Sequence, residues 1–281
     1  MKLSAGIHLP RQAHVTLRRG HLYKYKSLRG PGLSHVREIV RDSMIFCPSP
    51  EQLNDPRECK PTMVIGNVSD KTYWPRVERW VRRCVQHRDP LPTEGDIEAE
   101  LSQLTQAKLE SLVTSATTEY QREVNRRYRI LSLADSSSND HLWTQYADNY
   151  AGVSLEFFVN PTLGSAFEVI YTDAVSALDI TDDESIDSLI QTALVKRTEW
   201  APEREYRLVL SEPPIKGDPP LVQQRLQFGE ELLTGLIFGD HVDPDQRESL
   251  INQNRFRTSQ LRFYKARKTP EGNVLVGEMR T

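Results

Sequence analysis

Apolar and polar residues alternate along residues 205–210 with the period of two that a β-strand imposes. The apolar side of this strand, expected in the core, consists of Tyr206, Leu208 and Leu210. The opposite side begins with Glu205 and Arg207, and Glu203 stands just before the strand. The pattern alone favours a solvated strand entry with weak local ion pairs. A functional site built on the two carboxylates is the alternative.

Further strands and helices follow from the same kind of pattern. Alternation or a short apolar run predicts strands at residues 21–26, 44–47, 127–134, 152–158, 167–172, 222–228, 232–239, 260–266 and 273–277. Helices are predicted at residues 34–40, 75–87, 93–127, 141–149, 186–194 and 244–252. Ser34 is expected to cap the first of them, and the helix before Lys196 is expected to end by Pro202. Many short strands with interspersed helices indicate an α+β fold.

Residues 75–127 are expected to form a helical hairpin inserted into a single domain that spans residues 1–281. The first helix has an apolar face that includes Val77 and Val81, and the second carries a long apolar stripe that reaches Val124. The opposite face of the first helix is basic, with Arg76, Arg79, Arg82, Arg83 and Arg88. Such a face is commonly just solvated, and a patch for phosphates or RNA is the alternative.

Composition narrows the class of protein without naming an activity. The chain has 281 residues, a formal net charge of −3, 38% hydrophobic and 27% charged residues. That near-neutral balance does not indicate nucleic-acid or membrane binding, and no apolar run reaches the length of a membrane span. The three cysteines form no zinc-type pair, and no HExxH motif is present. We therefore expect a cytoplasmic protein without a dedicated metal site.

The loop from residue 48 to residue 58 is polar and lies between prolines. Its Asn54, Asp55 and Pro56 are typical of a turn, because short polar side chains bond to the local backbone. The loop is either a simple connection between secondary-structure elements or the wall of a functional site.

Four segments resemble one bacterial family of uncharacterised proteins, domain of unknown function 2971 (DUF2971). They are LYKYKS from Leu22, CPSPEQLNDPRE from Cys47, LWTQYADNYAGVSLEF from Leu142 and KRTEWAPEREYRLVL from Lys196. The resemblance covers most of the chain from about residue 21, and the family name implies no activity.

The order of parts also resembles, more distantly, the ADP-ribosyltransferase superfamily of the Arg-Ser-Glu type. Lys24 stands where that family has a first-strand arginine, Ser136 begins the serine-rich segment, and Glu203 and Glu205 match its Glu-x-Glu motif. Lysine for arginine is a departure, because the forked grip on a phosphate is lost while the charge remains. The resemblance implies a split β-sheet core with peripheral helices and the use of NAD as co-substrate.

The same resemblance implies a role for each residue. Glu205 would stabilise the oxocarbenium character that develops on the ribose, and Glu203 would orient or deprotonate the acceptor. Lys24 would hold the pyrophosphate. The remaining cofactor-binding candidates are Tyr25, Ser136, Trp143, Tyr146 and Arg207. For Trp143 a place in the core is favoured over a ligand contact. Arg207 is expected to pair with a site carboxylate, and Asn54 and Asp55 would lie at the rim of the cleft.

Two other function classes stay open at this point. One is a non-catalytic domain that binds a nucleotide or a protein, with Glu203, Glu205 and Arg207 as a structural network. The other is a metal-dependent nuclease toxin whose metal is gathered by Asp55, Glu58 and the carboxylates near Glu205. For a transferase the acceptor would be a nucleic acid or a protein. A toxin or antiviral-defence role, with an antitoxin or other defence partner, follows by family analogy.

Overall fold

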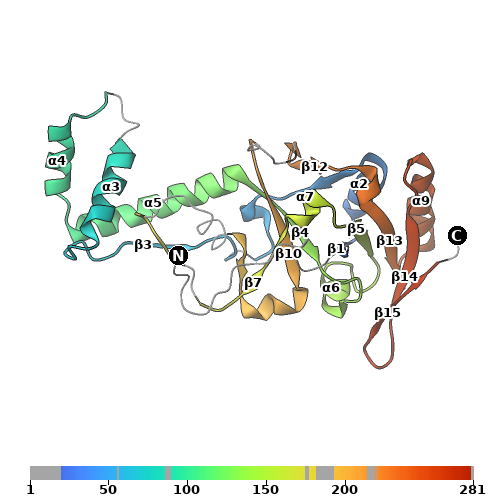
Figure 1. Ribbon diagram of the computed structural model, residues 1–281. Coiled ribbons are helices and arrows are strands. Elements are labelled where there is room, and N and C mark those ends of the chain that lie inside the picture. Colours follow the sequence, from blue (N-terminus) through green and yellow to red (C-terminus); the bar gives the residue numbers. More distant parts are fainter. Residues whose placement is uncertain are drawn as a thin grey trace.

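The structure is a computed structural model that describes residues 20–55, 57–85, 90–174, 177–181, 193–213, 219 and 221–279. It has an α+β fold, as the sequence predicts, built around a mixed eight-stranded sheet (Figure 1). The strand order is β15-β14-β13-β5-β1-β4-β10-β6. Neighbouring strands are antiparallel except β13 and β14, which are parallel. The strands are β1 (His21–Lys26), β4 (Tyr128–Ala134), β5 (Val153–Phe158), β6 (Phe167–Glu168), β10 (Glu205–Ser211), β13 (Leu233–Gly239), β14 (Arg262–Lys268) and β15 (Val274–Glu278).

The strands β1 and β4 part from each other within this sheet. They share one bridged pair among the described residues, Tyr23 with Ala134. By contrast, β1 is paired with β5 along its whole length, and β4 is paired with β10 along its whole length. The sheet therefore opens from Lys24 onward, between two halves that are each well bonded.

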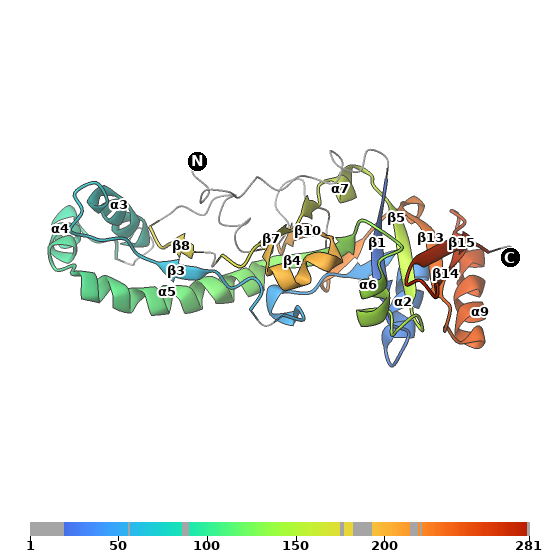
Figure 2. The same ribbon diagram turned by 90° about the horizontal axis from the view of Figure 1, so that it is seen from below.

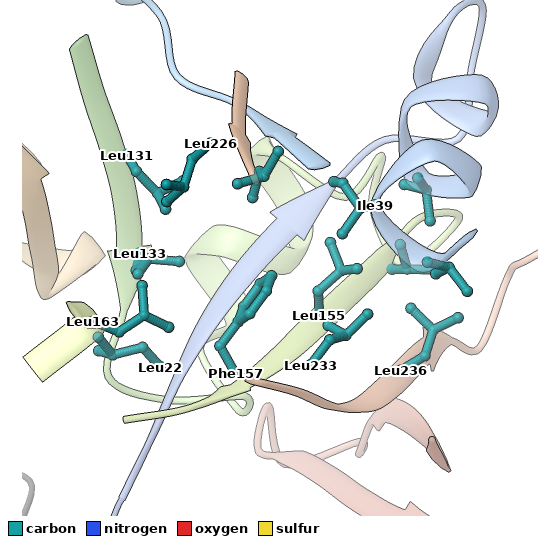
Figure 3. Close-up of a cluster of buried hydrophobic side chains, with 14 of the residues drawn as sticks. Leu22, Ile39, Leu131, Leu133, Leu155, Phe157, Leu163, Leu226, Leu233 and Leu236 are labelled. Carbon is teal, nitrogen blue, oxygen red and sulfur yellow. The ribbon is translucent and has the colours of Figure 1, made fainter. Parts of the chain in front are cut away.

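The main core lies on the side of the sheet to which α2 (Gly32–Asp42) contributes, and Figure 3 shows part of it. Leu131 and Leu133 of β4 meet Leu155 and Phe157 of β5 in this cluster (Figure 3). The apolar side of β10, Tyr206, Leu208 and Leu210, belongs to it as predicted. Burial of these side chains, at about 1.5–3 kcal/mol each, is what holds the two halves of the opened sheet together.

Helix α2 buries Val36, Ile39 and Val40 as predicted, but the prediction for its cap is wrong. The helix begins at Gly32, two residues earlier than expected, and the Ser34 hydroxyl donates to the carbonyl of Pro31 at 2.7 Å. Helix α9 (Pro244–Gln253) connects β13 to β14. It is joined to α2 by a 2.6 Å hydrogen bond that Arg37 donates to Ser249.

Three short sheets complete the strand inventory of the described residues. The predicted strand at residues 44–47 is β2 (Met44–Phe46), but it pairs with β12 (Arg225–Gln227) instead of joining the main sheet. Strand β12 also pairs with β11 (Leu221–Val222), so the strand expected at 222–228 is a hairpin. The second short sheet is a parallel pair of β3 (Thr62–Val64) and β8 (Ala177–Asp179).

The prediction of one strand at residues 167–172 is wrong, because the chain changes partners at Val169. The backbone amide of Val169 donates to the backbone carbonyl of Glu205. The next amide, that of Ile170, donates to the backbone carbonyl of Leu194. Strand β6 therefore stays with β10, while β7 (Ile170–Tyr171) pairs with β9 (Val195–Lys196). Lys196 thus lies in a strand and not at the end of a helix as expected, and Pro202 lies inside the short 3-10 helix η2 (Thr198–Glu203). Of the predicted helix at 186–194, residues 186–192 lie outside the described residues.

The predicted helical insertion lies to one side of the sheet, at the end of the molecule opposite β14, β15 and α9 (Figures 1 and 2). Its described residues form three helices and not two: α3 (Trp74–Val85), α4 (Glu94–Ser102) and α5 (Gln106–Arg127). The predicted second helix is interrupted because Thr105 caps a new helix by accepting from the Lys108 amide. These helices have their own apolar cluster, which includes Val77, Val81 and Leu109.

The basic face of α3 is largely paired. Arg82 contacts Glu78 and Glu94, and Arg83 donates to the carbonyl of Thr181 at 3.0 Å. Arg76 lies 3.7 Å from Asp179. This pairing favours the solvated structural face over a phosphate-binding patch for these three arginines. Arg88 lies outside the described residues.

The remaining helices of the described residues are short. They are α6 (Asp140–Gln145), α7 (Pro161–Gly164), η1 (Pro50–Gln52), η3 (Glu230–Leu232) and η4 (Asn254–Phe256). No described helix has the combination of length and apolar character that a membrane crossing needs.

Candidate functional site

A cavity of about 220 Å³ opens where β1 and β4 part. Its walls come from β1, β4, β9, β10, η2, the C-terminal end of α6 and the loop that follows β2. The apolar and aromatic lining consists of Tyr23, Tyr25, Pro48, Leu53, Leu133, Ala134, Leu142 and Tyr146. The polar lining consists of Lys24, Gln52, Asn54, Glu58, Ser132, Lys196, Glu203, Glu205 and Arg207. Apolar walls around a few convergent polar groups are typical of a small-molecule site.

Five of these polar residues form a buried charge cluster: Glu58, Lys196, Glu203, Glu205 and Arg207. Lys196 is at its centre, with Nζ 2.6 Å from Glu203 Oε2, 3.2 Å from Glu205 Oε2 and 3.6 Å from Glu58 Oε1. The Lys196 ammonium also lies 4.7 Å from the centre of the Trp200 ring. The η2 turn allows the contact between Lys196 and Glu203, because it folds the chain back so that Glu203 reaches a lysine seven residues earlier.

Arg207 closes the other side of the charge cluster. Its Nε donates to Glu205 Oε1 at 2.8 Å and its Nη2 to Glu205 Oε2 at 3.1 Å, the forked geometry that suits a carboxylate. Nη2 also donates to Glu58 Oε1, and Nη1 donates to the Ala193 carbonyl at 2.7 Å. Arg207 thus pairs with site carboxylates, as the sequence predicts.

The expectation of a solvated strand entry at Glu205 and Arg207 is wrong. Glu203, Glu205 and Arg207 are buried, with 4%, 5% and 1% of their surface exposed. The sequence pattern misleads because the charges on this side of β10 are covered by distant segments. The loop after β2 supplies Glu58, and β9 supplies Lys196. Charged side chains are buried when such partners neutralise them.

The charge cluster shifts the pKa values of Glu205 and Glu58 in opposite directions. Burial alone would raise the pKa of Glu205, but Arg207 and Lys196 outweigh it and bring that pKa to about 2. For Glu58 burial dominates, and Glu205 adds to it, so its pKa is raised despite Arg207. Three carboxylates against two cations give the ionised cluster a formal charge of −1.

Tyr146 connects the charge cluster to the rim of the cavity. Its hydroxyl donates to Glu203 Oε1 at 2.5 Å and accepts from Asn54 Nδ2 at 2.7 Å. Burial and the neighbouring Glu203 raise the pKa of Tyr146, so the phenol stays protonated and remains a donor. Asn54 is exposed, which puts this part of the loop at the rim, as predicted.

Lys24 faces the cavity from the opened edge of β1. Its Nζ donates to the Ser132 carbonyl of β4 at 2.7 Å, in place of the backbone amide that a closed sheet would supply. Part of the Lys24 surface is exposed to solvent, but the protein packed around the ammonium group desolvates that group. This desolvation, and then the charge of Lys26, lower the pKa of Lys24 to about 8.

Three of the predicted site residues lie outside the cavity lining. Trp143 is fully buried, stacked on Tyr150 at 5.3 Å, and its Nε1 donates to the Ser137 carbonyl at 2.9 Å. It therefore fills the core and does not line the cavity. The Ser136 hydroxyl shares a 3.0 Å hydrogen bond with the Ser138 hydroxyl.

Asp55 is the third of these residues. It is buried in its own turn, where it accepts from the Arg57 amide at 2.9 Å and from Trp200 Nε1 at 3.1 Å. Pro56, in the same turn, lies outside the described residues. The structure does bring Lys24, Tyr25, Tyr146, Glu203, Glu205 and Arg207 to one cavity, with Asn54 at its rim.

Sequence reasoning missed Lys196 as a site residue, and it named Glu58 only as a metal ligand of the nuclease alternative. Both stand inside the segments that carry the family resemblance, but neither has a local partner that marks it. Lys196 is in a two-residue strand and Glu58 in a turn, so neither follows a hydrophobic period.

Comparison of the chain with protein-family models, with curated proteins and with solved structures found no match. Among the residues that the structure describes, no group of three or more histidine, cysteine or acidic side chains is arranged to hold a metal ion.

Proposed function

We propose that this protein is an NAD-dependent ADP-ribosyltransferase-like enzyme. One observation carries the proposal: residues from three separate segments, Lys24, Tyr146 and the pair Glu203 and Glu205, line one cavity in the middle of the sheet. The parting of β1 and β4 supports the split-sheet arrangement that such an enzyme would have. The proposal for NAD itself rests on the resemblance in the order of the sequence motifs.

The electrostatics of the cavity suit the chemistry of glycosidic bond cleavage. Loss of nicotinamide from NAD develops positive charge on the ribose, and a fixed anion nearby stabilises that charge. Glu205 is such an anion, because Arg207 and Lys196 hold both of its oxygens and keep it ionised. When all three of its carboxylates are ionised, the charge cluster has a formal charge of −1, and this charge attracts the developing cation.

Glu203 and Tyr146 would position the acceptor. Glu203 Oε1 accepts from the Tyr146 hydroxyl, so this carboxylate lies beside a donor whose hydrogen bond can be exchanged for one to a bound ligand. An acceptor hydroxyl or amide near Glu203 Oε1 would then be oriented or deprotonated by it. Lys196 keeps the other oxygen of Glu203 in place.

The cavity size suits one end of the dinucleotide. Its 220 Å³ is below the roughly 300–1,000 Å³ of pockets for drug-sized ligands. The nicotinamide–ribose end would occupy it against Tyr23, Tyr25 and Tyr146, with the pyrophosphate at Lys24 and the adenosine end outside. The acceptor is a nucleic acid or a protein, and a toxin or defence role with an antitoxin partner is proposed on family analogy.

The contacts of the charge cluster disfavour the metal-dependent nuclease. The points where its carboxylates converge are filled by Lys196 Nζ and Arg207 Nη2. Asp55, which that alternative needs, is bonded to Trp200 and Arg57 instead. The non-catalytic binding domain is the alternative that the experiment below separates.

The test is incubation of the purified protein with NAD labelled in the adenylate phosphate and a cell lysate. Labelled product is then digested in parallel with protease and with nuclease, and the digestion that releases the label identifies the acceptor class. Free nicotinamide is measured in the same samples. The control variant for substitutions at Glu205 is Glu199→Gln. It removes an exposed carboxylate six residues before Glu205 that pairs with Arg57 and Arg197. No nicotinamide release by the wild type, together with measurable NAD binding, would favour the non-catalytic domain.

A further inference from the structure

The cavity contains two lysines in opposite chemical settings. Lys196 is surrounded by three carboxylates, which raise its pKa against the effect of burial. Lys24 has one hydrogen-bond acceptor, the backbone carbonyl of Ser132, and no carboxylate within ion-pair distance among the described residues. One lysine is therefore neutralised by its surroundings, and the other faces the cavity without a counter-ion.

Several charged or titratable groups act on Lys24. Lys26 on the same strand disfavours its protonated form, while Glu205, Cys47 and Glu203 favour it at longer range. Burial is the largest influence, and together these bring the pKa to about 8 from 10.5. Desolvation and a second cation nearby are the two conditions that turn a lysine into a nucleophile at neutral pH.

We propose that Lys24 is a carbonyl-capturing amine, and that the cavity takes a small planar aldehyde or ketone as a covalent, reversible ligand. Tyr23 and Tyr25 on β1 and Tyr146, directly after α6, provide aromatic walls for such a ligand. The opened sheet edge gives access to Nζ, because β4 contributes only a carbonyl at that point. The proposal uses the cavity of the proposed transferase but does not need NAD.

The reaction is balanced with the groups present. The lone pair of neutral Nζ attacks the carbonyl carbon, and the electron pair of the C=O bond moves to oxygen. A proton passes from nitrogen to that oxygen and gives a carbinolamine. Loss of the hydroxyl group and of the second nitrogen proton as one water leaves the C=N bond. Water reverses the sequence, and no oxidant or reductant is involved.

The test is reductive trapping with pyridine-3-carboxaldehyde, which has a ring of the nicotinamide type, and sodium cyanoborohydride at pH 7. Intact-protein mass and peptide mapping identify the labelled lysines at low reagent excess. A pKa of about 8 instead of 10.5 gives Lys24 a roughly 300-fold larger neutral fraction than an ordinary lysine. After allowance for the weaker nucleophilicity of a less basic amine, we expect Lys24 to label at least about tenfold faster than exposed Lys71.

The chain provides its own controls. Lys196 lies in the same cavity and should stay unlabelled, because its three carboxylates keep it protonated. Lys24→Arg keeps a positive charge and should abolish the fast label, and its melting temperature shows whether the fold is retained. Lys26→Gln removes the neighbouring cation and should slow the trapping of Lys24 several-fold.

Labelling of Lys24 no faster than of Lys71 would overturn the proposal, and so would equal labelling of Lys196. The outcome is independent of the proposed transferase activity. Trapping at Lys24 without NAD turnover would leave this inference standing and remove the transferase. NAD turnover without selective trapping would do the reverse.

Discussion

Replacement of Glu205 by glutamine separates a catalytic role from a structural one. The amide has nearly the same size, but it removes the anion that Arg207 grips with two hydrogen bonds and Lys196 with a third. Loss of a positioned electrostatic group costs on the order of 10²–10⁴-fold in rate, or roughly 3–5 kcal/mol of barrier at about 1.36 kcal/mol per tenfold. We expect nicotinamide release to fall by that factor, with little change in NAD affinity.

The same substitution also destabilises the fold, because it leaves two buried cations with fewer partners. Breaking a buried ion pair costs about 3–5 kcal/mol. At about 2–4 °C per kcal/mol for a chain of this size, the melting temperature should fall by roughly 6–20 °C. Activity must therefore be measured well below the melting temperature of the variant, with far-UV circular dichroism on the same sample.

Glu58→Gln is the matched control for this experiment. Glu58 is buried and contacts Arg207 and Lys196, as Glu205 does, so its loss should lower the melting temperature by a similar amount. Glu205 and Glu203 remain in place, and the rate should fall at least tenfold less than in Glu205→Gln. Equal rates in the two variants, or normal turnover in Glu205→Gln at a lowered melting temperature, would refute the catalytic role of Glu205.

Three further outcomes follow from the same cavity. Tyr146→Phe removes a hydrogen bond to a charged group, so the free energy of unfolding, measured with urea, should fall by about 1.5–3 kcal/mol. The pKa of Glu205 is about 2 when folded and 4.5 ordinarily. This shift stabilises the fold above about pH 4.5 and is lost as the pH falls toward 2, and a smaller acid sensitivity of Glu205→Gln in urea titrations would show it. Binding of NAD should weaken as the pH rises through about 8, where Lys24 loses its charge, and calorimetry on Lys24→Met should show no such pH dependence.

Much of the fold could be predicted because its strands repeat with a period of two. The strand β1 has the predicted bounds, and β4, β5 and β10 differ from their predictions by a residue or so. The strands that were wrongly placed are short and exchange partners, as at Val169, where two successive amides bond to different segments. No periodic pattern records such an exchange, because it is decided by where β9 and β10 lie in space.

The site could be predicted only in part, because a sequence pattern shows which residues are unusual but not which distant segments cover them. Glu203 and Glu205 could be found because their spacing at a strand entry is unusual, and Lys24 because it stands where the resembled superfamily has a first-strand arginine. Their burial could not be predicted, since it depends on Lys196 and Glu58, which come from segments with no pattern of their own. A dense group of charges at a strand entry therefore indicates a buried cluster as readily as a solvated edge, once a cation can reach it from elsewhere.

The protonation state of Lys24 connects the two proposals for the cavity. With Lys24 protonated, three cations balance three carboxylates, and the positive charge at the opened edge of β1 can hold a phosphate group. With Lys24 neutral, the charge cluster leaves the cavity with a formal charge of −1, and the amine becomes a nucleophile. NAD binding and imine formation therefore need opposite forms of one side chain. As the pH rises through about 8, the first should weaken while the second accelerates, and a single residue should account for both curves.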